Sequence, residues 1–155
     1  MFTIELKDDD LVSALERLKA GMEDMSELTN EIGEFLAESH QQRIERSLGA
    51  PDGTAWARNS PFTKTRDPRP LIDSGEMVKR IHHQYGRDFV EVVASGKQVR
   101  TMHYGAKKGA FGQTAKGGPL PWGDIPARPF MGLSDSDRSD IADALQEWWE
   151  RLAQA

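Results

Sequence analysis

The segment IPARPFMGLS occupies residues 125–134 and places two prolines around a single arginine. Each proline fixes its own φ at about −65° and pushes the preceding residue toward an extended conformation. Arg128 is therefore expected on a stiff, strand-like arm, and this arm is expected at an edge because proline cannot pair inside a sheet. Phe130, Met131 and Leu133 then enter the core. A rigid arm that carries an arginine suits a fixed ion pair or a contact between subunits.

A helix is predicted directly after this arm. Ser134 is a good N-cap residue, and the acid Asp137 three positions later completes a variant of the capping box. Apolar residues then recur at helical spacing, namely Ile141, Leu145, Trp148 and Leu152. The pattern predicts an amphipathic helix from about residue 135 to about residue 153.

The first third of the chain predicts a short strand followed by helices. Residues 2–6 alternate apolar and polar side chains, as a half-buried strand does, and Asp8-Asp9-Asp10 suit a helix N-terminus. The apolar stripe that follows weakens around Gly21 and residues 26–30, so it forms either an antiparallel helix pair or one broken long helix. The stripe is expected in the core and comprises Leu11, Leu15, Leu18, Met22, Met25, Leu28, Ile32, Phe35, Leu36, Ile44 and Leu48. Gly49 and Pro51 mark its end.

Two long connections divide the rest of the chain. Residues 49–72 contain four prolines and two glycines. Trp56 and Phe62 are expected to anchor this loop, because large aromatic side chains bury enough area to hold an irregular segment. Residues 105–124 contain six glycines and two prolines. Because glycine loses the most backbone freedom on ordering, we expect a flexible loop there, ordered only against a partner.

Between these loops, residues 77–94 predict an antiparallel hairpin that turns at Gly86-Arg87-Asp88. Alternatively, Ser74 caps a helical turn that runs through Arg80. Residues 99–104 suit a short helix or an extended stretch. Together the elements predict one α+β domain over residues 1–155, with N-terminal helices and a C-terminal helix packed on a small antiparallel β-sheet and long Gly/Pro-rich loops.

Composition excludes several classes of protein. The chain has no cysteine, which excludes disulfides and thiolate metal sites and fits maturation in a reducing cytoplasm. No apolar run approaches the roughly 20 residues that span a bilayer, and the start MFTIELKDDD lacks the basic region of a signal peptide. We expect no membrane partner.

Charge is distributed unevenly along the chain. Residues 1–48 carry 5 basic and 12 acidic side chains, residues 49–128 carry 13 and 7, and residues 129–155 carry 2 and 6. Acidic ends therefore flank a basic middle. The pattern fits solvated helix faces, complementary contacts between subunits, or a basic surface that faces nucleic acid.

The sequence offers no catalytic constellation, so we expect no enzyme, no catalytic residue, no metal and no cofactor. The histidines are His40, His82, His83 and His103. HxxxH, HExxH, GxSxG and the phosphate-binding glycine motifs are all absent. The rival hypothesis is a small cytoplasmic enzyme or nucleic-acid-binding protein that uses His82, His83 or His103. It requires these histidines to converge with a carboxylate in one pocket.

A second set of candidate residues is basic. Lys107, Lys108 and Lys116 lie in the glycine-rich loop near Phe111 and Trp122. Cations interleaved with aromatic side chains can bind nucleic acid by charge and stacking. Three lysines are few for that purpose, and a solvated surface is the simpler interpretation. These lysines are nevertheless candidates to face DNA.

The segment at residues 125–134 also resembles a known family. IPARPFMGLS resembles the "PARPFLGLS" signature of the phage virion morphogenesis family, which comprises tail-completion proteins. Leu71-Ile72-Asp73-Ser74-Gly75 with Met77 resembles the family element L-x-x-S-G-x-L. Residues 102–105 resemble its Y-A-x-x-H-Q-x-G stretch only loosely. The resemblance covers nearly the whole chain, and the arginine-proline-phenylalanine element is its specific part.

This resemblance implies a structural virion protein that completes the tail or forms part of the neck at the head–tail junction. It implies a ring of copies of the chain, often a hexamer, in contact with other tail or neck proteins and non-specifically with packaged DNA. The protein would be found in the virion after assembly in the host cytoplasm. The candidate subunit interface comprises Arg128, Pro126, Pro129, Phe130 and Trp56. A head-closure or adaptor protein on the portal side is the alternative within the same class.

Overall fold

The computed structural model describes residues 9–154 of the chain. The strand expected at residues 2–6 lies outside this range. In chain order, the elements are α1 (Asp9–Glu23), α2 (Ser26–Glu45), α3 (Glu76–Lys79), β1 (Ile81–Tyr85), β2 (Val90–Ala94), α4 (Val99–Tyr104) and α5 (Asp135–Gln154). The predicted α+β class is confirmed. No helix within residues 9–154 is long and apolar enough to cross a membrane.

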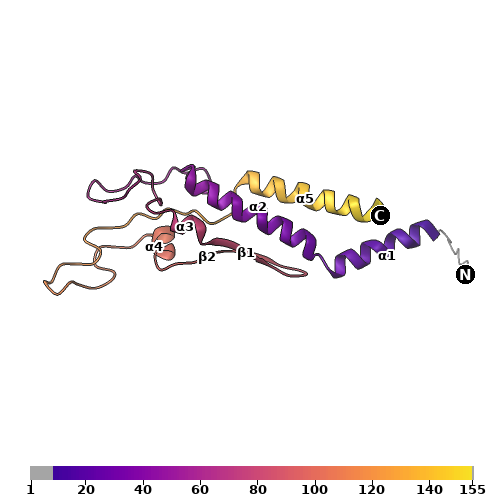
Figure 1. Cartoon of the computed structure of the whole chain (residues 1–155), viewed down its shortest axis with the longest axis horizontal. Helices are drawn as coiled ribbons and strands as arrows, with labels where there is room; N and C mark the ends of the chain where they lie inside the picture. The colour runs from indigo at the N-terminus through magenta and orange to yellow at the C-terminus, as the bar shows by residue number, and fades with distance from the viewer. Residues whose placement is uncertain (1–8, 155) are drawn as a thin grey trace, which may run out of the picture.

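The two N-terminal helices follow one another end to end, and α5 runs back alongside α2 (Figure 1). Of the two predicted arrangements, the broken long helix is therefore correct and the antiparallel pair is wrong. The break falls at Asp24 and Met25, not at Gly21, which lies inside α1. It coincides with a tertiary contact, because the Met25 amide donates to the carbonyl oxygen of Arg87 at 3.0 Å.

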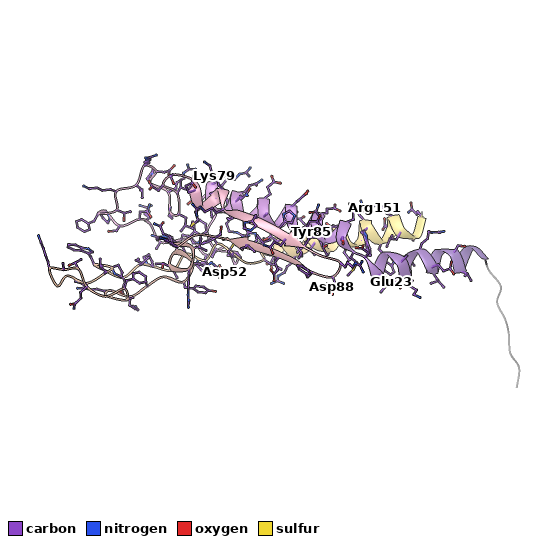
Figure 2. The ribbon with its side chains drawn as sticks, turned by 60° about the horizontal axis from the view of Figure 1, so that its bottom comes forward. Glu23, Asp52, Lys79, Tyr85, Asp88 and Arg151 are labelled. Carbon is purple, nitrogen blue, oxygen red and sulfur yellow. The ribbon has the colours of Figure 1, made fainter. Side chains whose placement is uncertain are left out.

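Strands β1 and β2 form the antiparallel hairpin, with Ile81 opposite Ala94 and Tyr85 opposite Val90. The hairpin is shorter than residues 77–94, because the helical turn α3 precedes it, as in the alternative prediction. The predicted cap is wrong, however, because the N-cap of α3 is Gly75 and not Ser74. Its turn approaches the α1–α2 junction, and Figure 2 shows Asp88 near Glu23 there. The Thr29 hydroxyl donates to the carbonyl oxygen of Gly86 at 2.6 Å and ties the turn to α2.

Helix α2 lies between the hairpin and α5, so the core has two sides. One side is a cluster of Ala37, Ile44, Ile81 and Phe130, and the other buries Trp148 of α5. The hairpin approaches α2 closely at the buried Gly33, where an added Cβ would come within 2.4 Å of the His83 ring. The C-terminal helix thus packs on α2 and α1, and α2 is the helix that covers the sheet.

Several side chains that were expected in the core are exposed. Leu15 and Met22 of α1 are 55% and 58% exposed, and Leu48 is 61% exposed. Leu48 lies beyond the end of α2, which stops at Glu45, four residues before Gly49. Leu133, which follows Gly132 with its φ of 137°, is 37% exposed. The prediction of burial was wrong for these four residues.

The two long loops differ in how they are held. In loop 49–72, Trp56 packs against the core as predicted, whereas Phe62 is 92% exposed and anchors nothing within the described chain. Residues 106–125 form an irregular hairpin, which the glycine-rich composition did not predict. Ala106 and Ile125 exchange two backbone hydrogen bonds at its base, and further bonds join Phe111 to Leu120 and Thr114 to Gly118. We call this segment the glycine hairpin.

Candidate functional site

The arm at residues 125–134 bonds to four separate parts of the chain. Its Arg128 amide donates to the carbonyl oxygen of Met102 in α4 at 2.9 Å. The Trp56 indole of loop 49–72 donates to the carbonyl oxygen of Pro129 at 2.8 Å. Ile125 pairs with Ala106 at the base of the glycine hairpin, and Phe130, fully buried, joins the core cluster that includes Ile44 of α2. The arm is thus the centre of the tertiary structure as well as a candidate site.

Arg128 is 5% exposed, and its guanidinium is used within the chain. Nε donates to the carbonyl oxygen of Ala57 at 2.8 Å, and Nη2 donates to that of Arg58 at 2.9 Å. Its partners are backbone carbonyls, so the expected ion pair is not present among residues 9–154. In this chain Arg128 holds loop 49–72 against the arm.

The other four residues of the candidate interface divide by exposure. Phe130 is fully buried, Trp56 and Pro129 are half-buried, and Pro126 is exposed. A side chain buried inside one chain cannot contact another, so only the partly exposed members remain available for a contact between subunits. That role stays a prediction for Pro126, Pro129 and Trp56.

A buried polar network joins α2, the arm and α5, and the sequence analysis did not predict it. Arg43 donates from Nη2 to Asp137 at 2.9 Å, and from Nη1 to the carbonyl oxygens of Phe130 and Gly132 at 3.0 and 3.2 Å. The side chains of Arg43 and Asp137 are 6% and 3% exposed. Asp137 also accepts hydrogen bonds from Ser39 and Ser134, so the predicted capping box at Ser134 is present.

The network shifts the pKa values of two of its members, Asp137 and His40. Burial by itself raises the pKa of Asp137, but hydrogen bonds from Ser39, Ser134 and Arg43 outweigh it and bring the pKa to about 2. Burial lowers the pKa of His40. A neutral His40 fits its contacts, because Nδ1 donates to the carbonyl oxygen of Leu36 and Nε2 accepts from the Gly132 amide at 3.0 Å.

One signal could have revealed this network. His40 and Arg43 lie on the same side of α2 as the buried Leu36 and Ile44. Polar residues within an apolar helical stripe are buried only with partners. Their partners lie about ninety positions later in the chain, and no local pattern gives that pairing.

The three candidate lysines have unequal surroundings. Lys107 pairs with Asp124 across the base of the glycine hairpin at 3.2 Å. Lys108 and Lys116 are exposed, and neither forms an ion pair with any described residue. Two cations on a projecting hairpin therefore remain available to a partner.

The histidines named in the enzyme hypothesis do not converge. His82 is exposed on β1, His83 contacts Asn30 at 2.9 Å, and His103 accepts from the Phe130 amide at 3.4 Å. Among residues 9–154, no group of three histidine or acidic side chains could hold a metal ion. The convergence that the enzyme hypothesis requires is therefore not found in the described chain.

A groove of about 670 Å³ lies between loop 49–72, α4 and the start of the arm. Leu71, Met77 and Met102 contribute apolar walls, and Asp73 and Arg80 contribute charge. Its lining mixes charges of both signs and presents no arrangement typical of a catalytic centre.

Comparison with known proteins identifies the family. The family model described as "Phage virion morphogenesis family" matches residues 6–150. The chain belongs to that family. Virion morphogenesis proteins build phage particles, so the chain has a structural or assembly role in a phage.

Two relatives of this family member are also known. The "Mu-like prophage FluMu G protein 2" of Haemophilus influenzae is 27% identical over 154 residues, which covers 98% of this chain and 99% of that protein. The "Putative capsid assembly protein G" of Escherichia phage Mu is 27% identical over 119 residues, which covers 72% of this chain and 71% of that protein. No solved structure matches the chain.

Proposed function

We propose that this chain is a tail-completion protein that acts at the head–tail junction as a ring of identical subunits, with six as the expected number. It would contact other tail or neck proteins in the same junction. The observation that supports the proposal is the number of large apolar side chains exposed on the surface of this virion morphogenesis subunit. Among the described residues, thirteen large apolar side chains are exposed, whereas seven hydrophobic residues are buried.

An isolated soluble protein rarely leaves large apolar patches in water, and subunits of an assembly commonly do. Here the exposed apolar side chains occur at both ends of an elongated molecule. Phe62, Phe111 and Trp122 are on the loops, and Leu145 and Trp149 are on α5 (Figure 1). Two separate surfaces on one subunit suit a head-to-tail interface, which closes into a ring when the rotation between neighbours permits.

The position of this subunit in the phage particle is inferred from the arm at residues 125–134. Residues 125–134 resemble the signature of tail-completion proteins, and one relative is named for capsid assembly. A subunit between capsid and tail is consistent with both. The head-closure or adaptor position on the portal side is the alternative, and binding to isolated particles separates the two.

The test uses the parent phage with this gene deleted. We expect DNA-filled heads and tails of normal length to accumulate unjoined. Purified protein should restore joining when it is first bound to tails and the unbound protein is washed away. Restoration only after binding to heads would establish the portal-side alternative, and normal joining without the protein would overturn both positions.

Ring formation is tested separately. Native mass spectrometry of the full chain, of mass 17.3 kDa, should give a closed oligomer in solution or on isolated tails. Negative-stain images should show the same particle as an annulus. A strict monomer in both settings would contradict the ring.

A further inference from the structure

The sheet of the described chain has only two strands, so β1 and β2 each have an outer edge. At the two ends of the pair, the Gly86 amide donates to the carbonyl oxygen of Phe89 at 2.9 Å, and the Ser95 amide donates to that of Arg80 at 3.1 Å. Bonded and non-bonded pairs alternate along an antiparallel ladder, so these two bonds fix the pattern between them. The β2 residues whose backbone amides and carbonyls point away from β1 are Val90, Val92 and Ala94.

This outer edge of β2 is open in the described part of the chain. None of its outward amides and carbonyls forms a hydrogen bond with a described residue. The outer edge of β1 is partly used, because the side-chain amide of Gln41 donates to the carbonyl oxygen of Ile81 at 3.0 Å. Strand β2 also has no proline, no lysine and no bulge, which are the features that commonly block an edge. The edge of β2 can therefore accept another strand.

The chain contains a segment with the pattern of such a strand outside the described residues. Residues 2–6, FTIEL, alternate apolar and polar side chains, and phenylalanine, threonine and isoleucine favour strands. The outward-pointing residues of β2 have their side chains on the α2 side of the sheet. Val90 approaches Gly33 there, and Val92 and Ala94 pack against the core. An apolar face on the added strand can therefore continue an apolar face of the sheet.

Residues 2–6 cannot lie along β2 of their own chain. Helix α1 has 15 residues and extends about 22 Å from Asp9 to the α1–α2 junction. The hairpin turn contacts that junction, and β2 runs from the turn away from α1 (Figure 1). If residues 2–6 paired with β2, the three peptide links from Leu6 to Asp9 would have to span this distance. Three residues span at most about 11 Å. Only the β2 edge of another copy is within reach.

We propose that residues 2–6 of one copy add as a third strand to the outer edge of β2 in the next copy. This proposal rests on the proposed ring and names one of its contacts. Backbone hydrogen bonds supply the affinity, and the alternating side chains set the register. Phe2, Ile4 and Leu6 lie on the α2 side of the sheet, and Thr3 and Glu5 face solvent. Each copy gives one strand and accepts one, so the contact is head-to-tail and repeats around a closed ring.

The first test introduces prolines into the donated strand of the full chain. Adjacent amides of a strand point to opposite edges, so Ile4→Pro with Glu5→Pro removes one amide that faces β2 in either register. This variant should associate at least about tenfold more weakly than the natural chain, because proline cannot donate to the ladder. Ile4→Val with Glu5→Thr is the matched control, since it removes the same charge and keeps residues that favour strands. The control should associate like the natural chain, and urea unfolding of both variants checks that the fold is retained.

The second test uses the absence of cysteine from the chain, which lets introduced thiols report a single contact. Ile4→Cys is combined in one chain with Val90→Cys, Val92→Cys or Ala94→Cys, and each protein is oxidised with copper phenanthroline. Thiols on neighbouring strands of one face lie close together, so at least one combination should give a ladder of linked copies on a non-reducing gel. Mass spectrometry should identify the link from position 4 to β2. Ile4→Cys with Gln84→Cys is the control, because Gln84 lies on β1, which the added strand does not contact.

Different results separate the possible failures. If the proline variant assembles normally, or if no combination links position 4 to β2 of another copy, this contact is wrong while the ring itself stands. An oxidised monomer with position 4 linked to its own β2 also overturns the proposal.

If the natural chain forms no ring on tails or in solution, the proposed function fails first. The contact is then judged by oxidising the same cysteine variants in concentrated solution. Linked copies joined through position 4 and β2 support the contact, and their absence overturns it.

Discussion

A few single residues hold the arm at residues 125–134 in place. The buried polar residues His40, Arg43 and Asp137 are among them. Arg43 neutralises Asp137 and also caps two arm carbonyls, so one guanidinium serves three partners. Such a pair gives little net stability compared with an apolar replacement of both partners. Removal of only one partner is costly, because it leaves a buried charge without compensation.

Arg43→Met should therefore lower the free energy of unfolding by about 3–5 kcal/mol, measured by urea denaturation near pH 7. Arg46→Met is the matched control, because Arg46 is exposed at the end of α2, and its effect should stay within about 0.5 kcal/mol. Equal effects of the two substitutions would show that the Arg43–Asp137 pair does not hold the arm.

His40 makes stability depend on pH in the mildly acidic range. Burial lowers its pKa below the ordinary value of 6.5, so the unfolded chain takes up a proton that the folded chain does not. The free energy of unfolding should therefore decrease as the pH falls below 6.5. Burial lowers the pKa of His103 too, which adds to the same slope. His40→Gln should reduce the slope, and His40→Gln with His103→Gln should reduce it further.

Asp137 acts in a lower pH range. Its pKa of about 2 lies below the ordinary 3.8, so its contribution to the free energy of unfolding is complete above pH 3.8 and is lost as the pH falls toward 2.

The prediction for His40 is tested in the milder range. A stability profile of the natural chain that stays flat between pH 7 and pH 5 would contradict the role given to His40.

The residues that could be predicted are those whose partners are local. Ser134 and Asp137 lie three positions apart, and the capping box they form was predicted correctly. Arg128 was predicted to make a fixed contact, and in place of the expected ion pair its guanidinium donates to backbone carbonyls in loop 49–72. A proline-flanked arginine indicates that the guanidinium is fixed in place. It does not indicate which distant atoms will accept the hydrogen bonds of that guanidinium.

At the scale of elements, two helical glycines mark the closest approaches. Gly33 meets the His83 ring and Val90 of the hairpin, and Gly21 meets the end of the Leu152 side chain. Glycine inside a helix costs about 1 kcal/mol relative to alanine, so its presence at these contacts needs a reason of packing. A leucine side chain can rotate away, whereas the ring on β1 is held by its contact with Asn30.

Gly33→Ala should therefore lower the free energy of unfolding by about 1–3 kcal/mol, despite the better helix propensity of alanine. Gly21→Ala should be close to neutral or stabilising, because Leu152 can move. Both are measured by urea denaturation under the same conditions. A stabilising Gly33→Ala would mean that the hairpin is not packed on α2 as described.

The glycine hairpin gives a prediction about local order. The amides of Ala106, Phe111, Leu120 and Ile125 donate hydrogen bonds across it, so their hydrogen exchange should be slower than that of unbonded loop amides. Lys64 and Lys116, for which no backbone bond is formed by the amide, serve as references. Uniformly fast exchange would instead support the flexible loop expected from composition.

Element type followed from the sequence more reliably than element contacts did. Helix α5 and the β1–β2 hairpin were predicted because their spacing and caps are local features. The backbone hydrogen bonds across residues 106–125 were not predicted. Glycine content indicates how flexible a segment can be, but it does not show which hydrogen bonds will order that segment. The apolar stripe of α1 predicted a helix correctly but not what covers it, since Leu15 and Met22 remain exposed.

At the scale of the whole molecule, one chain does not bury the surface that its apolar pattern was expected to bury. Leu145 and Trp149 on α5, like Phe111 and Trp122 on the glycine hairpin, are exposed in the described chain. A search for a core within one sequence assigns every apolar stripe to that core. Only the structure separates the part of a stripe that the chain buries from the part that it leaves exposed.

The separation of charge along the molecule predicts how assembly responds to salt. Opposite charges on the basic middle segment, residues 49–128, and on the acidic segments before and after it attract mainly through solvent, where the screening length falls from about 10 Å at 0.1 M salt to about 3 Å at 1 M. Association of the natural chain, measured by sedimentation velocity or on isolated tails, should therefore weaken as NaCl is raised across this range. The free energy of unfolding, measured at the same salt concentrations, controls for loss of the fold. If assembly instead strengthens with salt, apolar contact alone drives it and the charge separation has no part in choosing the partner.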